Sequence, residues 1–214
     1  MSAGRIGLGL GRQICLLFLG VLLLLSGECS AQAPIKIVAF GTSNTLGRYV
    51  ARGSDYPAKL EAALRAKGHN VQVTNAGRNG DMIAGALARL DSAVPVDTQI
   101  AIVEFGVNDR REHNSPAYIQ ASLDKIVDRL RERNIEVVVA NYFDVSGGPV
   151  ARGTYFIDFD VARMPASLKI PDDPLHHLNA AGYDVIVVRL LPAVEALIAR
   201  VHKREREREH EHEH

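Results

Sequence analysis

Cysteine is almost missing from this sequence. Its two cysteines, Cys15 and Cys29, both lie within the first thirty residues. If that segment is removed, the rest of the chain has no thiol, which excludes disulfides, thiolate metal sites and a cysteine nucleophile. An excess of charge is also missing, because 25 basic and 25 acidic side chains give a formal net charge of zero. This balance points to neither a nucleic acid nor an acidic partner.

Long apolar runs are missing too, apart from "ICLLFLGVLLLL" at 14–25. This run is too short to span a bilayer comfortably as a helix. Arginines precede it and small residues follow it, which is typical of a secretory signal peptide. We therefore predict a signal peptide over 1–31, cleaved after Ala31 or, less favourably, after Ala33. The mature protein is then periplasmic or secreted and has no stable membrane insertion; an uncleaved anchor is the alternative.

The opposite end of the chain, "KREREREHEHEH" at 203–214, alternates charges and has no apolar face. It predicts a solvated, frayed extension of the last helix. Between the two ends, residues 34–202 show no internal repeat and no linker. Apolar residues make up 47% of the chain, and this length is enough to bury the core of one domain.

Within 34–202, strand and helix patterns alternate. Short runs rich in β-branched residues predict buried parallel strands at 35–40, 71–74, 99–105, 135–143 and 154–159. Helical patterns, with caps and apolar stripes, occupy 54–68, 81–94, 115–134 and about 179–202. Such alternation implies right-handed crossovers, so we predict an α/β fold in three layers, with a doubly wound parallel sheet of about five strands.

Ligands of such sheets bind beyond the carboxyl ends of the strands. Four segments are expected at that edge, namely "GTSNT" (41–45), "NAGRNGD" (75–81), "GVNDRR" (106–111) and "PDDPLHHLN" (171–179). They come from distant parts of the chain and carry a hydroxyl, glycine-bearing turns, an amide, paired aspartates and two histidines. The topology therefore predicts one polar site built from all four.

These side chains suit acyl transfer, which needs a nucleophile, a base and a group that orients the base. Ser43 is the candidate nucleophile and His176 or His177 the candidate base. Asp173 is close enough in sequence to orient either ring. Each residue also has a purely structural interpretation, because serine and aspartate are common in turns and a histidine beside a helix start is often a surface residue.

Acyl transfer also needs donors for the developing oxyanion. The backbone N–H groups of Ser43 and Gly80 and the side-chain amide of Asn108 are the candidates. Taken singly, Gly80 is equally suited to a turn before a helix, and Asn108 to a loop or cap.

The four segments, in this order, resemble the sequence blocks of the SGNH hydrolases, also called GDSL esterases. The resemblance matches Ser43 to the nucleophile, Gly80 and Asn108 to the oxyanion residues, and "DPLHHLNAAGY" (173–183) to the block with the aspartate and histidine. It implies a flavodoxin-like α/β/α sandwich without metal or cofactor. It also implies hydrolysis of small-molecule esters and thioesters through an acyl-enzyme, as in arylesterases, acyl thioesterases and lysophospholipases.

The sequence departs from the family pattern at two places. Thr42 and Asn44 stand where the family usually has aspartate and leucine, which puts the geometry of the nucleophile loop in question. The last block also holds one histidine too many. The spacing Asp-x-x-His selects His176, whereas counting back from "LNAAGY" selects His177; the tighter aspartate–imidazole constraint favours His176.

These observations predict an exported serine esterase that uses Ser43. A carbohydrate O-acetyl esterase on the same residues is the first alternative. A non-catalytic binding protein that keeps the fold is the second.

Overall fold

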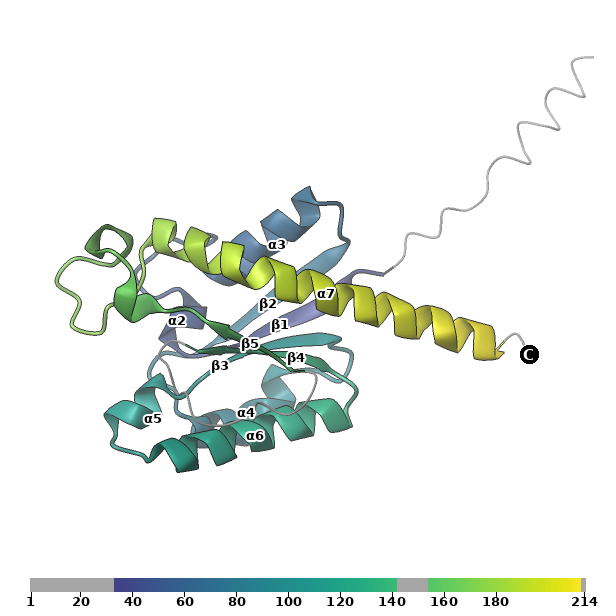
Figure 1. The fold of residues 1–214 in the computed structure, drawn as a ribbon, viewed down its shortest axis with the longest axis horizontal. Coiled ribbons are helices and arrows are strands. Elements are labelled where there is room, and N and C mark those ends of the chain that lie inside the picture. Colours follow the sequence, from purple (N-terminus) through teal and green to yellow (C-terminus); the bar gives the residue numbers. More distant parts are fainter. Residues whose placement is uncertain (1–32, 142–153, 213–214) are drawn as a thin grey trace, which may run out of the picture. The chain divides into compact units, whose positions relative to one another are not determined.

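The computed structural model describes residues 33–141 and 154–212. The predicted signal peptide and its cleavage sites lie outside the described residues, as do residues 142–153. The described residues form a sheet of five parallel strands, in the order β2-β1-β3-β4-β5 (Figure 1). The strands are β1 (Ile35–Gly41), β2 (Val71–Gly77), β3 (Ile100–Glu104), β4 (Glu136–Asn141) and β5 (Tyr155–Asp158). The predicted doubly wound parallel sheet of five strands is therefore confirmed.

Two helices cover each face of the sheet (Figure 1). The pair α3 (Tyr56–Ala66) and α7 (Ala180–His212) packs on one face, and the pair α4 (Ile83–Ala93) and α6 (Pro116–Glu132) packs on the other. Strand β1 serves both cores, because successive side chains of a strand point to opposite faces. Ile35, Ile37 and Ala39 join the core under α3 and α7, whereas Val38 and Phe40 join the core under α4 and α6.

Helices α3 and α6 begin where local chemistry predicts. The carboxylate of Asp55 accepts a hydrogen bond of 3.1 Å from the backbone N–H of Ala58, and the hydroxyl of Ser115 accepts one of 3.2 Å from that of Tyr118. Each cap precedes a proline in the first helical turn, where the missing N–H costs nothing. Both helix starts are thus set by their own sequence.

Helix α7 is longer than its apolar stripe predicts. It contains Pro192 and continues to His212, well beyond the apolar positions that end at Val201. The predicted frayed tail is thus helical through His212. An ion pair of 3.0 Å between Arg204 and Glu136 ties the first turn of this extension to β4. Within the described residues, no helix combines the length and apolar character needed to cross a membrane.

The carboxyl ends of three strands lie at one level. Gly41 of β1 pairs with Gly77 of β2 on one side and with Glu104 of β3 on the other. Two short helices that the sequence patterns did not predict follow at this edge, α2 (Ser43–Leu46) after β1 and α5 (Val107–Arg111) after β3. Ser43 and Asn108 therefore sit at the start of short helices rather than in open loops.

Candidate active site

Ser43 is the first residue of α2 and follows the end of β1 by one residue. The turn between them depends on the glycine at position 41. A Cβ at Gly41 would lie 2.1 Å from the hydroxyl oxygen of Thr45 and 2.8 Å from a carboxylate oxygen of Glu104. Any side chain at this position would push the turn away from β3, so the close approach that places Ser43 requires glycine.

Glu104, at the end of β3, organises the segment around Ser43. Its fully buried carboxylate accepts hydrogen bonds from the backbone N–H of Thr42 (3.0 Å), the hydroxyl of Thr42 (2.9 Å) and the hydroxyl of Thr45 (3.0 Å). Burial raises the pKa of Glu104, and these donors partly offset the effect. A buried carboxylate with several donors is costly to disturb, so it holds α2 in one position against β3.

This arrangement accounts for Thr42, the first departure from the family pattern. The threonine hydroxyl donates to Glu104. An aspartate in the same orientation would instead place a second carboxylate against a buried one. The unusual residue therefore supplies a donor that this glutamate needs, and the loop geometry that the sequence put in question is well determined.

A row of hydrogen bonds joins Ser43, His177 and Asp173. The Nε2 atom of His177 lies 2.8 Å from the Oγ of Ser43, and its Nδ1 lies 2.7 Å from Oδ2 of Asp173. The same carboxylate oxygen accepts the backbone N–H of His177 at 2.6 Å. The imidazole is 2% exposed and the serine 6%, so the row is shielded from solvent.

The structure contradicts the preference for His176 over His177. The backbone N–H of His176 donates to the carbonyl of Asp173 at 3.0 Å, and His176 adopts a left-handed conformation with φ of 56°. The chain turns at this residue, so the side chain of the next residue, His177, faces the carboxylate of Asp173. Counting residues along Asp-x-x-His assumes a regular path, and the left-handed turn breaks that assumption.

The charge states follow from the surroundings of the pair. Burial lowers the pKa of His177 below its ordinary value of 6.5, the bond to Asp173 partly offsets this, and the charges of Arg48 and Arg111 lower it further. Burial acts to raise the pKa of Asp173, but the hydrogen bonds from the backbone and ring of His177 outweigh it, and the net shift is downward. At neutral pH the carboxylate is ionised and the imidazole neutral. An ionised carboxylate only accepts, so Nδ1 carries the proton and Nε2 is free to accept from Ser43.

Asn108 is hydrogen-bonded to the residue that follows Gly80. The side-chain amide of Asn108 donates to the backbone carbonyl of Asp81 at 2.8 Å, one residue after Gly80. An amide nitrogen has two hydrogens, so this bond orients Asn108 and leaves a second donor. Gly80 has φ of 70°, and nothing lies within 4 Å of where its Cβ would be. Glycine is thus needed there for the left-handed turn rather than for space.

Asp109 and Arg89 are structural residues of the site that the sequence did not reveal. The Asp109 carboxylate accepts from the backbone N–H of Ile83 at 3.2 Å, so Asp109 binds the start of α4. Arg89 donates to Asp81 (2.7 Å) and to the carbonyls that end β1 and β2. These contacts join the segments that carry Ser43, Gly80 and Asn108. Only the isolated charge of Glu104, within the apolar run "QIAIVEF", could have been recognised beforehand as a buried carboxylate.

A parallel α/β sheet that carries a serine, a histidine and an aspartate in one hydrogen-bonded row at its carboxyl edge is typical of serine hydrolases. The chain belongs to the GDSL-like lipase/acylhydrolase family, whose model matches residues 39–155. The resemblance seen in the four sequence blocks is therefore confirmed.

Individual relatives agree with this assignment. Esterase TesA of Pseudomonas aeruginosa is 29% identical over 119 residues, which cover 55% of this chain and 58% of that protein. The matched segment thus spans less than two thirds of TesA. The crystal structure of AlinE4, an SGNH-hydrolase family esterase, is 30% identical with a TM-score of 0.57, and the match covers 78% of this chain and 98% of AlinE4.

A family 3 carbohydrate esterase of Clostridium thermocellum is similar in fold. It superimposes with a TM-score of 0.67 at 18% identity, covering 78% of this chain and 98% of that structure. This likeness concerns the architecture and not the substrate.

Proposed function

We propose that this protein is an exported serine esterase that hydrolyses carboxylic esters and thioesters through an acyl-enzyme on Ser43. The observation that carries the proposal is the position of the His177 ring, which is bonded to Asp173 on one side and to Ser43 on the other. A buried neutral imidazole in this position can remove the serine proton, which is the step that makes a hydroxyl nucleophilic. Membership of the lipase/acylhydrolase family supports the same reaction.

The reaction proceeds in two halves. Oγ of Ser43 attacks the ester carbonyl while Nε2 of His177 takes its proton, and the ionised Asp173 stabilises the imidazolium. The imidazolium returns the proton to the leaving oxygen or sulfur as its bond to the acyl carbon breaks. Water, deprotonated by the same ring, then hydrolyses the acyl-serine.

Asn108, Gly80 and Ser43 supply the oxyanion donors in this proposal. Ser43 begins α2, and the first N–H groups of a helix lack an intrahelical acceptor. The bond from Asn108 to the carbonyl of Asp81 supports the assignment, because it fixes the amide next to Gly80. A preorganised donor stabilises the transition state without having to reorient during the reaction.

Covalent labelling tests the nucleophile. A fluorophosphonate probe should label the wild-type protein and fail to label Ser43→Ala. Ser167→Ala, at an exposed serine on the 3-10 turn Ala166–Leu168, is a matched control that should label like wild type. Absence of labelling in the wild-type protein would favour the non-catalytic binding protein.

The acyl preference separates the two enzymatic alternatives. Rates should be measured with para-nitrophenyl esters from acetate to decanoate, on the protein without its first 31 residues. Hydrolysis that extends to longer acyl chains fits the proposed esterase. Activity confined to acetate would instead indicate the carbohydrate O-acetyl esterase.

Export belongs to the same proposal and rests on the pattern of residues 1–31. The full-length chain, expressed in a bacterium, should appear in the periplasmic or culture fraction with Gln32 or Pro34 as its first residue. N-terminal sequencing of the purified protein measures this. Recovery of the intact N-terminus in the membrane fraction would indicate an uncleaved anchor.

A further inference from the structure

We infer that the site is adapted to esters or thioesters whose leaving alcohol or thiol carries a negative charge, which Arg48 and Arg111 bind beside His177. The inference rests on the proposed function and adds the substrate class. The composition alone would not suggest a positively charged site, because the chain as a whole has no formal net charge. The positive charge is a local property of the site.

Arg48 is held next to the imidazole. Its guanidinium donates to the side-chain oxygen of Asn79 at 2.6 Å and lies over the ring of Tyr49, 4.6 Å from the ring centroid. The Tyr49 ring in turn meets the His177 ring edge-on, at 5.4 Å between centroids. Tyr49 adopts φ of 71°, a left-handed conformation that is strained for a tyrosine. The packing thus keeps Arg48 beside the catalytic histidine.

Arg111 reaches the same histidine from another element. It ends α5, and its guanidinium donates to the carbonyl of Leu175 at 3.3 Å. Leu175 lies between Asp173 and His177, so Arg111 contacts the turn that carries both. Two arginines from separate parts of the fold therefore contact the surroundings of His177, and the charges of both act on its imidazole.

Among the residues that the structure describes, no carboxylate pairs with either arginine. In the described part of the chain, the hydrogen bonds of Arg48 and Arg111 go to an amide oxygen and a backbone carbonyl, and neither arginine forms an ion pair. Arg89, which only joins structural segments, is paired with Asp81 at 2.7 Å. The two arginines at the site thus retain their full charge for a ligand.

The charges of the two arginines disfavour a protonated His177. Both arginines lower the pKa of His177, which means that they destabilise the imidazolium formed when Ser43 attacks. A negative charge on the substrate would offset this repulsion in the transition state. Guanidinium groups also match carboxylate and phosphate oxygens in geometry and bind them through paired N–H donors.

The chemistry of the proton transfer assigns the charge to the leaving group. His177 gives its proton to the leaving oxygen or sulfur, so the atoms nearest the imidazole belong to the alcohol or thiol. The carbonyl oxygen faces Asn108 and Gly80 instead. Groups that flank His177 therefore contact the leaving half of the substrate, and its carboxylate or phosphate is the group they bind.

Matched acetyl esters test the inference. We would measure kcat/KM for para-acetoxybenzoate, whose leaving group is anionic, and for its neutral methyl ester. The ratio of the two values should fall by about 3-fold to 5-fold in Arg48→Gln and in Arg111→Gln, and by about 10-fold in the double variant. In the wild-type protein, raising the ionic strength should lower the same ratio, because salt screens exposed charges.

Two further variants serve as controls. Arg52→Gln removes an exposed arginine of the same loop, for which the described residues show no contact with His177, and should leave the ratio within about 1.5-fold of wild type. Arg48→Lys keeps the charge and should retain most of the ratio. A purely structural role for Arg48 would not produce this recovery or the salt dependence. An unchanged ratio in both arginine-to-glutamine variants overturns the inference.

Two additional substrates test which half of the substrate must carry the negative charge and which anion the arginines prefer. The para-nitrophenyl monoester of succinate, whose charge lies on the acyl half, should show no dependence on the two arginines relative to the neutral butyrate ester. An equal dependence would overturn the assignment to the leaving group. A para-acetoxyphenyl phosphate distinguishes phosphate from carboxylate recognition, since the preferred anion gives the larger fall in Arg48→Gln.

Failure of the inference differs from failure of the proposed function. If neither acetyl ester is hydrolysed in a manner that depends on Ser43, the esterase assignment is wrong and the inference falls with it. If both are hydrolysed and their ratio is insensitive to the arginines, only the inference is wrong.

Discussion

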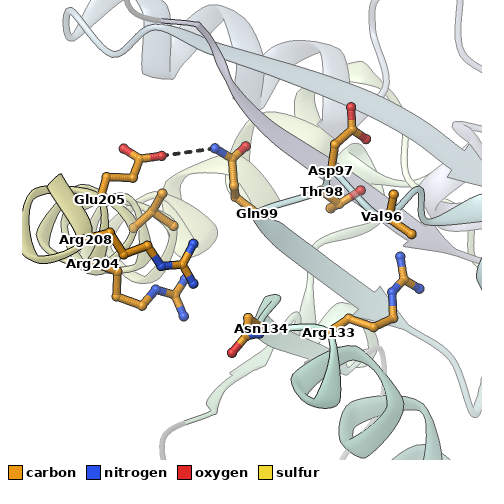
Figure 2. A pocket seen from close by; sticks show the side chains of 10 residues that line it. Val96, Asp97, Thr98, Gln99, Arg133, Asn134, Arg204, Glu205 and Arg208 are labelled. Carbon is orange, nitrogen blue, oxygen red and sulfur yellow. Dashed lines mark hydrogen bonds between the residues drawn. The ribbon is translucent and has the colours of Figure 1, made fainter. Parts of the chain in front are cut away.

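The two ends of the central sheet both carry arginines, but they use them differently. At the amino end, a cavity of about 250 Å3 is lined by the segment before β3, the turn after α6 and the C-terminal part of α7 (Figure 2). Its Arg204 pairs with Glu136 at 3.0 Å, and its Arg133 faces Asp91 at 3.6 Å. At the carboxyl end, Arg48 and Arg111 face a histidine and neutral oxygens.

Arg133 and Arg204 at the amino end face carboxylates of the protein itself. We propose that Arg48 and Arg111 at the carboxyl end are available to a substrate instead. The amino-end pairs join α7, α6 and β4 to their neighbours, and Gln99 adds a bond of 3.3 Å to Glu205 (Figure 2). The charge of Arg204 is balanced by Glu136 within the protein, so this pair leaves little for a ligand. At the carboxyl end, the charges of Arg48 and Arg111 disfavour protonation of His177, and we propose that an anionic group of the substrate balances them.

The largest expected effect concerns the two neighbouring histidines at the carboxyl end. His177→Gln should lower kcat by about 10³-fold or more, because the serine loses its base. His176→Gln should change kcat by less than about 3-fold, since its side chain is exposed and the bonds to Ser43 and Asp173 remain. Steady-state hydrolysis of a para-nitrophenyl ester measures both. The reverse order would restore His176 as the base.

A smaller loss of activity is expected when the proposed oxyanion donor Asn108 is replaced. Asn108→Ala should lower kcat by about 10²-fold, because one preorganised donor to the developing charge is removed. Asn114→Ala, in the loop before α6, is the matched control and should stay within about 2-fold. Equal, small losses in both variants would mean that Asn108 is not an oxyanion donor and serves only to hydrogen-bond the carbonyl of Asp81.

The pH dependence of kcat/KM tests the effect of Arg48 on the pKa of His177 without removing a proposed catalytic group. Because the pKa of His177 is lowered, the acid limb of kcat/KM should have its midpoint below 6.5. Arg48→Gln removes one of the causes and should move this midpoint upward. A midpoint at or above 6.5 in the wild-type protein, or no shift in the variant, would contradict the assigned surroundings of His177.

The same pKa shift affects stability with a defined sign. In the folded protein His177 binds a proton less readily than in the unfolded chain, so the stability it contributes falls as the pH drops below 6.5. Asp173, whose folded pKa is also lowered, adds a loss at still lower pH, below its unfolded value of 3.8. Urea unfolding across this range should show both losses in the wild type. The loss near 6.5 should be absent in His177→Gln.

The smallest effect is expected at the amino end. Arg204→Gln breaks a partly exposed ion pair with Glu136 and should lower the free energy of unfolding by about 0.5–1 kcal/mol. It should not alter the ratio between anionic and neutral esters. Urea denaturation, with Glu136→Gln and the double variant completing a cycle, measures the pair. A change in the ester ratio would mean that the two ends of the sheet are not functionally distinct.

Most of the fold could be predicted because it depends on local patterns. Runs of β-branched residues marked the strands, and apolar stripes with candidate caps marked the helices. The extension of α7 to His212 could not be predicted in this way. It has no apolar face, and the charges that anchor it, Glu136 among them, lie far away in the sequence.

Most residues of the candidate site could be selected from the sequence, but which histidine contacts Ser43 could not. Ser43, Gly80 and Asn108 were selected because they follow strands whose carboxyl ends meet at one edge. Asp173 was selected from the segment before the last helix, and the resemblance to the family's sequence blocks supported all four. The choice between His176 and His177 was missed because it depends on a left-handed turn at a residue that is not glycine. Sequence spacing carries no reliable signal for such a turn.

The amino-acid order was therefore sufficient to predict the family, the layers of the fold and most residues that gather at one edge, because hydrophobic periodicity and sequence motifs are read directly along the chain. The ring that meets Ser43, the hydrogen bonds of Glu104 to the turn before it and the positions of Arg48 and Arg111 near His177 emerged only in the folded molecule. Each depends on distances between residues that are remote along the chain, and those distances are set by packing.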